Sequence, residues 1–161
     1  MTMRYFLSAA FIALPLASSM AFAKTTTRFL DNGKDGFSVG FEDPSCGGEC
    51  YEGALSCNRD GTNVEFEFGL VEPSDAVIVV SNENRSFTLT AGKVSTTFNA
   101  TELHFVEMTG AWVMSGPSFE DTDKLLAAMA KAKTFTAVAG KGKTDLPVTS
   151  DVKTWIKRCG G

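Results

Sequence analysis

The sequence predicts a domain of the α+β class. We expect an antiparallel β-meander or a sandwich-like sheet, packed with one longer helix and a short C-terminal helix and stapled by disulfides. Three observations support this prediction: short alternating segments separated by turns, helical periodicity after Pro117, and four cysteines behind an export signal. Because consecutive strands joined by short turns usually lie side by side, the strands should form a meander.

The strand signal is clearest at 63–71, where Val64, Phe66 and Phe68 alternate with polar residues. A period of two places one face of a strand in the core and the other in water. Gly92-Lys93 lies where a tight hairpin turn would join two further strands. The predicted strands span 27–30, 36–41, 63–71, 76–80, 86–90, 94–98, 103–108, 111–114, 134–139 and 146–148.

Two helices are expected near the C-terminus. Ser118 can cap a helix that runs to about residue 133, with Leu125, Leu126 and Met129 on its apolar side. Ser150 or Asp151 would cap a last short helix that ends near Cys159. Between the predicted strands 36–41 and 63–71, the segment that carries the first two cysteines is predicted to be a loop. It holds Pro44, Gly47, Gly48 and Gly53.

The N-terminus has the three parts of a secretory signal peptide. Arg4 precedes the apolar run from Tyr5 to Leu16, and the small-residue pattern Ala21-Phe22-Ala23 follows. The apolar run is shorter than the roughly 20 residues that a membrane-spanning helix needs. We therefore expect 1–23 to be cleaved and 24–161 to form a single exported domain without a transmembrane segment, in the periplasm or outside the cell.

Charge is unevenly distributed along this domain. Residues 24–118 hold six basic and fourteen acidic residues, a net of −8, whereas residues 119–161 hold eight basic and five acidic, a net of +3. Such asymmetry can steer a charged partner or let the two halves attract each other. Nucleic acid is not an expected partner, because neutralising phosphates requires a dense basic surface.

Four cysteines in an exported chain imply two disulfides. Three pairings are possible for Cys46, Cys50, Cys57 and Cys159, and each complete pairing ties the C-terminus to the 46–57 segment. We favour Cys46 with Cys50 and Cys57 with Cys159, because Gly47-Gly48 gives the backbone freedom to close a small ring. The alternative of a redox or zinc site is disfavoured, because three residues separate Cys46 from Cys50, instead of the two of a Cys-x-x-Cys motif.

The candidate binding surface is an acidic cluster around the first two cysteines. Its members are Glu42, Asp43, Glu49 and Glu52. Fixed carboxylates on a loop would attract a cation or a basic protein, and the alternative is a solvated acidic face. The alternating oxygen ligands of a calcium loop are absent, so no metal site is predicted.

No catalytic residue and no cofactor are predicted. His104 is the only histidine, and its acidic sequence neighbours do not form a recognisable catalytic set. The chain has no nucleophile elbow and no phosphate-binding loop. Trp112, Trp155 and the many phenylalanines are expected to build the core.

The C-terminal quarter resembles one known family. Leu125-Leu126-Ala127-Ala128-Met129, then Lys131-Ala132-Lys133, an alternating strand, a Gly/Lys turn and a final helix are similar to the end of invasion-associated locus B proteins. This resemblance implies a small exported bacterial protein of the cell envelope, in which these elements close a β-rich domain. The chain departs from the family in its 46–57 segment and its terminal cysteine, and the resemblance assigns no functional residues.

These observations favour a non-enzymatic periplasmic or secreted protein that binds another protein or an envelope component. The alternative is an inhibitor or immunity protein directed against a basic hydrolase, such as a lysozyme or a peptidoglycan amidase, which the acidic front of the chain would attract. An enzyme with carboxylates dispersed along the sequence is the third hypothesis.

Overall fold

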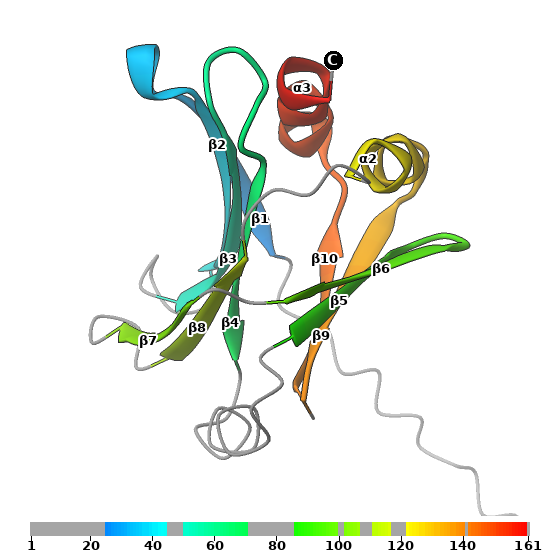
Figure 1. The fold of residues 1–161 in the computed structure, drawn as a ribbon. Helices are drawn as coiled ribbons and strands as arrows, with labels where there is room; N and C mark the ends of the chain where they lie inside the picture. The colour runs from blue at the N-terminus through cyan, green and yellow to red at the C-terminus, as the bar shows by residue number, and fades with distance from the viewer. Residues whose placement is uncertain are drawn as a thin grey trace, which may run out of the picture.

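The computed structural model describes residues 25–44, 50–70, 86–99, 102–106, 111–116, 122–140 and 142–160. Within these ranges the chain forms two antiparallel β-sheets and two α-helices (Figure 1). None of the described helices is long and apolar enough to cross a membrane. The predicted signal peptide, 1–23, lies outside the described residues.

The larger sheet has six strands in the order β1-β2-β3-β4-β8-β7. Its strands are β1 (Thr26–Asp31), β2 (Phe37–Asp43), β3 (Cys50–Cys57), β4 (Glu65–Leu70), β7 (Glu102–Val106) and β8 (Ala111–Gly116). A short 3-10 turn, η1 (Gly33–Asp35), joins the first two strands. The smaller sheet has four strands in the order β10-β9-β5-β6. They are β5 (Ser86–Ala91), β6 (Val94–Asn99), β9 (Thr134–Ala139) and β10 (Gly142–Pro147).

The two sheets face each other across a core of phenylalanines. The ring centroids of Phe66 and Phe98 are 5.1 Å apart, and those of Phe68 and Phe87 are 5.7 Å apart. Each pair joins a strand of the larger sheet to a strand of the smaller one, at distances typical of favourable aromatic packing. The sequence prediction of a sandwich-like antiparallel fold with two helices and a disulfide is therefore confirmed.

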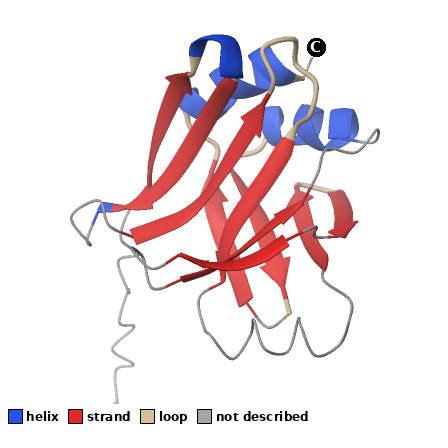
Figure 2. Ribbon diagram, turned by 60° about the vertical axis from the view of Figure 1, so that its left-hand side comes forward, coloured by secondary structure: helices blue, strands red, loops and turns tan. Residues whose placement is uncertain are grey.

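Two helices fill the space between the sheets at one end of the sandwich (Figures 1 and 2). Helix α2 (Thr122–Lys131) contacts β5 and β6, and helix α3 (Ser150–Cys159) contacts β1 and β2. Their apolar sides are buried, and Trp155 on α3 has no exposed surface, as expected for a core tryptophan. The side chain of Trp112 lies outside the described part.

The prediction of the helix caps was wrong at α3. The cap is Thr149, whose hydroxyl accepts a hydrogen bond from the backbone N–H of Val152 at 3.4 Å. Thr149 also lies 2.6 Å from the hydroxyl of Thr27, which donates to Asp151 at 3.0 Å. The first strand therefore fixes the start of the last helix, which a local capping rule does not consider. The Ser118 cap predicted for α2 lies outside the described residues.

The last part of the predicted loop, from Cys50 to Gly53, is a strand. Residues 50–57 form β3 at the centre of the larger sheet, with Leu55 and Cys57 buried. A side chain at Gly53 would lie 2.6 Å from the carbonyl oxygen of Glu67 on the neighbouring strand. Gly53 therefore allows two strands to approach closely and does not form a turn. The predicted strand at 76–80 lies outside the described residues.

One predicted disulfide is confirmed. Cys57, at the end of β3, is bonded to Cys159, at the end of α3, with their Cα atoms 5.9 Å apart. Cys46 lies outside the described residues, so its pairing with Cys50 stays a prediction. The observed bond fastens the C-terminus of the chain to the middle of the larger sheet.

Candidate functional site: the acidic face of the larger sheet

The outer face of the larger sheet carries the candidate site. Both helices lie between the two sheets, so no described helix covers this face (Figures 1 and 2). Alternation along β4 sends Phe66 and Phe68 into the core and the intervening glutamates outward. We use the name acidic face for the outward carboxylates on β2, β3 and β4, which are Glu42, Glu52, Glu65 and Glu67.

A β-bulge brings two members of the acidic face together. The register between β2 and β3 shifts after Phe41, so that Tyr51 and Glu52 both stand against Glu42. Glu52 is half-buried, and its Oε2 is itself buried without a hydrogen-bond partner among the described residues. Because that oxygen is covered, Glu52 contributes to the face through its negative charge.

The other two glutamates follow from the pairing of β3 with β4. Glu67 stands opposite Ala54, and Glu65 stands opposite Ser56, whose hydroxyl donates to it at 3.5 Å. Glu65 is exposed and Glu67 is half-buried. The outward positions between these carboxylates hold small side chains on β2 and β3, so a partner can approach the backbone closely. These small residues are Ser38, Gly40, Ala54 and Ser56.

Charge is segregated between this face and the helices. Arg28 on β1 is the one cation at an outward strand position of this sheet within the described ranges. Basic side chains gather on the exposed side of α3 instead, at Lys153, Lys157 and Arg158. Arg59, at the end of the sheet, is already paired with Asp31 at 2.6 Å. The negative potential of the acidic face is therefore only weakly compensated locally.

The structure places the predicted acidic residues as follows. Glu42 and Glu52 lie together across β2 and β3, whereas Asp43 ends β2 opposite Cys50. Glu49 is not among the described residues. Sequence reasoning missed Glu65 and Glu67 as members of the site. The alternation along β4 did place them on the solvent-facing side of that strand. Their proximity to Glu52, however, depends on β3, whose first residues were predicted to be a loop.

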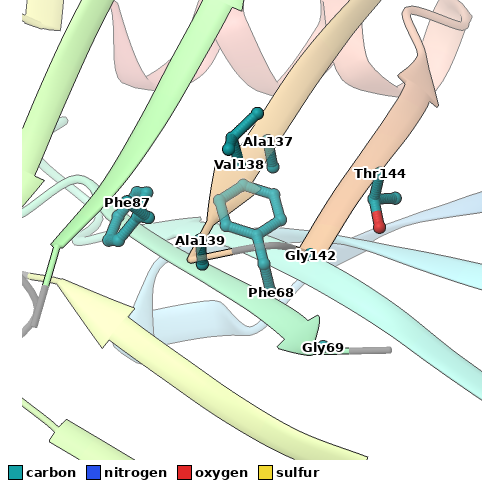
Figure 3. A pocket seen from close by; sticks show the side chains of 8 residues that line it. All are labelled: Phe68, Gly69, Phe87, Ala137, Val138, Ala139, Gly142 and Thr144. Carbon is teal, nitrogen blue, oxygen red and sulfur yellow. The ribbon is translucent and has the colours of Figure 1, made fainter. Parts of the chain in front are cut away.

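The described residues offer no metal centre at this site. No group of three or more His, Cys, Asp or Glu side chains among them is arranged to hold a metal ion. A small cavity lies at the end of the sandwich away from the helices (Figure 3). Its volume is about 10 Å³, which is room for about one water molecule. Phe68, Phe87 and Ala139 are among the apolar residues that line it.

His104 lies on β7, in register with Val113 on β8. Its backbone is described and its side chain is not, so a role for its imidazole stays outside the structure. Comparisons of the chain with protein-family models, with curated proteins and with solved structures found no match.

Proposed function

We propose that this chain is a non-enzymatic binding protein of the periplasm or the cell exterior, and that it uses the acidic face to bind a basic partner. The partner is another protein or an envelope component. The observation that carries this proposal is the gathering of Glu42, Glu52, Glu65 and Glu67 on one sheet face that no described helix covers.

The export signal expected at 1–23 and the Cys57–Cys159 disulfide support an oxidising compartment, because disulfides are rare in the cytosol. The resemblance of the C-terminal quarter to invasion-associated locus B proteins favours the cell envelope as that compartment. A carboxylate face with small residues between its charges suits a protruding basic surface, since complementary charges accelerate encounter and select partners.

A second candidate function is inhibition of, or immunity to, a basic hydrolase such as a lysozyme or a peptidoglycan amidase. The same acidic face favours it, because these enzymes present cationic surfaces to which a sheet of glutamates is complementary. The two functions differ in one measurable respect: an inhibitor abolishes the hydrolase's activity at saturation, whereas a simple binding protein leaves that activity unchanged.

We predict that the oxidised full-length mature chain binds at least one member of a panel of basic hydrolases, and that Glu65→Gln/Glu67→Gln weakens this binding about tenfold. Exposed charge pairs contribute about 0.2–1 kcal/mol each, and about 1.4 kcal/mol corresponds to tenfold in affinity. Calorimetry at low and high salt measures both effects. Raising the salt concentration should weaken the wild type more than the variant, because fewer charges remain to be screened.

The control is Asp123→Asn, which removes one exposed negative charge from α2 on the other side of the core. We expect it to bind nearly as well as the wild type. Binding that ignores salt would show that charge does not drive the interaction. A loss of equal size in the Asp123 variant would show that net charge, and not the acidic face, is responsible. A hydrolytic activity of the chain itself that His104→Ala abolishes would overturn the non-enzymatic assignment.

A further inference from the structure

Strand β6 is an edge strand without the usual protection. Exposed edges invite pairing with other chains, and proteins blunt them with charges, prolines or bulges. Two of the other three edges carry such a device among the described side chains: Arg28 on β1, and Pro147 with the Lys143–Asp145 ion pair on β10. Strand β6 has the sequence VSTTFN, with neither charge nor proline, and its register with β5 has no bulge.

The hairpin geometry shows which backbone groups of β6 face the free edge. A two-residue turn, Gly92-Lys93, joins β5 to β6, and the first pair after it is Ala91 with Val94. That first pair is hydrogen-bonded in a hairpin of this type, and hydrogen-bonded pairs then alternate with non-bonded ones. The N–H and C=O groups that point away from β5 therefore belong to Ser95, Thr97 and Asn99.

The side chains agree with this assignment. In non-hydrogen-bonded pairs the side chains lie closer together. The hydroxyls of Thr88 and Thr97 are 2.8 Å apart, and those of Thr90 and Ser95 are 2.9 Å apart. Ser95, Thr97 and Asn99 are exposed on the outer face of the smaller sheet. No described strand pairs with this edge.

Charge favours a second copy of this chain as the occupant. The chain has a net charge of −4, so two copies repel unless they meet where negative charge is absent. The acidic face belongs to the other sheet, and the β6 edge is uncharged apart from Lys93 at the turn. The tip of the β5–β6 hairpin also projects from the sandwich at the right of Figure 1.

We propose that β6 pairs antiparallel with β6 of a second copy, which joins two four-stranded sheets into one continuous sheet of eight strands. The contact is isologous, so each copy offers the same strand and the dimer closes. Serine and threonine hydroxyls from both copies meet across the new strand pair, as they do between β5 and β6. Because six residues a side form a small interface, the dimer is weak and forms as the protein concentration rises.

This dimer would deepen the proposed function. A two-fold axis perpendicular to the smaller sheet preserves which face of the sheet points outward, so the acidic faces of both copies point to the same side. A partner with repeated basic sites would then be bound twice, which raises its overall affinity through effective concentration. This consequence rests on the proposed function, whereas the dimer itself does not.

Sedimentation velocity of the oxidised chain over concentrations up to the sub-millimolar range tests the dimer. We expect a monomer–dimer equilibrium for the wild type and a monomer at every concentration for Thr97→Lys, which sets two like charges close together at the new strand pair. The matched control is Thr88→Lys on β5. It adds the same charge to the same sheet face and breaks the same hydroxyl pair one strand further in, and it should still dimerise.

Circular dichroism establishes that each variant is folded, and Ser95→Lys replaces Thr97→Lys if the latter unfolds. A wild type that stays monomeric throughout would overturn the proposal. So would equal loss of dimer in the Thr88 and Thr97 variants, because a sheet-edge contact distinguishes these two positions. A monomeric wild type that binds basic hydrolases would overturn the dimer and leave the proposed function in place. A dimer that binds none of them would overturn the proposed function and leave the dimer in place.

Discussion

Replacing Cys57 and Cys159 together with serine should lower the free energy of unfolding by about 2–5 kcal/mol. The bond joins residues 102 positions apart, and the chain-entropy model assigns about 4.7 kcal/mol to a loop of about 100 residues. A domain has only about 5–15 kcal/mol of net stability, so this bond contributes a large share. Both sulfurs are buried, at 4% and 5% exposure for the two residues, so the new hydroxyls would also need hydrogen-bond partners.

The matched control is Cys46→Ser/Cys50→Ser. A disulfide between these residues would close a ring of only five residues, worth about 2 kcal/mol in the same model. Urea unfolding followed by circular dichroism, with and without reductant, compares the two double variants. Reductant should add the smaller loss, about 2 kcal/mol, to the Cys57/Cys159 variant and the larger loss, about 2–5 kcal/mol, to the Cys46/Cys50 variant. Without reductant, a larger loss in the Cys46/Cys50 variant would contradict both the loop-length argument and the pairing that we favour.

The fold could be predicted wherever neighbouring segments carry their own signal. Alternation at 63–71 located β4, and Gly92-Lys93 located the β5–β6 hairpin. Strands that follow one another in sequence do pair, as the meander predicts, in β1 to β4, β5 with β6, β7 with β8 and β9 with β10. These pairings are local, so turn residues and periodicity are enough to specify them.

The pairings that cross the chain could not be predicted. Strand β4 lies beside β8, and β5 lies beside β9, and these pairings divide the strands between two facing sheets. No local pattern specifies such contacts, because they depend on how the phenylalanines of both sheets fill one core. For the same reason, the candidate site could be predicted only in part. Glu65 and Glu67 join Glu52 only once β3 is placed as a strand, and Gly53 is as typical of a turn as of a close strand contact.

Replacing Gly36 with alanine should destabilise the protein by about 3 kcal/mol or more. Gly36 has φ of 107° and ψ of −147°, a region of backbone space that only glycine adopts readily. Its new Cβ would overlap the carbonyl oxygen of Cys57 and lie 2.9 Å from the Cα of Asn58. Backbone strain of this kind costs about 1–3 kcal/mol, and moving the end of β3 adds to it because Cys57 is tied to α3.

Alanine substitutions at two nearby glycines separate the cost of backbone strain from the cost of steric overlap. Gly33 has φ of 63°, and no atom lies within 4 Å of the position that a Cβ would take there, so Gly33→Ala should cost only about 1 kcal/mol for the backbone conformation. Gly40 on β2 has an ordinary φ and open space, so Gly40→Ala should be close to neutral. Thermal and urea unfolding of the three variants should rank them Gly36, Gly33, Gly40. Suppose that Gly36→Ala lowered the free energy of unfolding no more than Gly33→Ala. The steric contact between residue 36 and the end of β3 would then be relieved easily, because Cys57 could shift despite its disulfide.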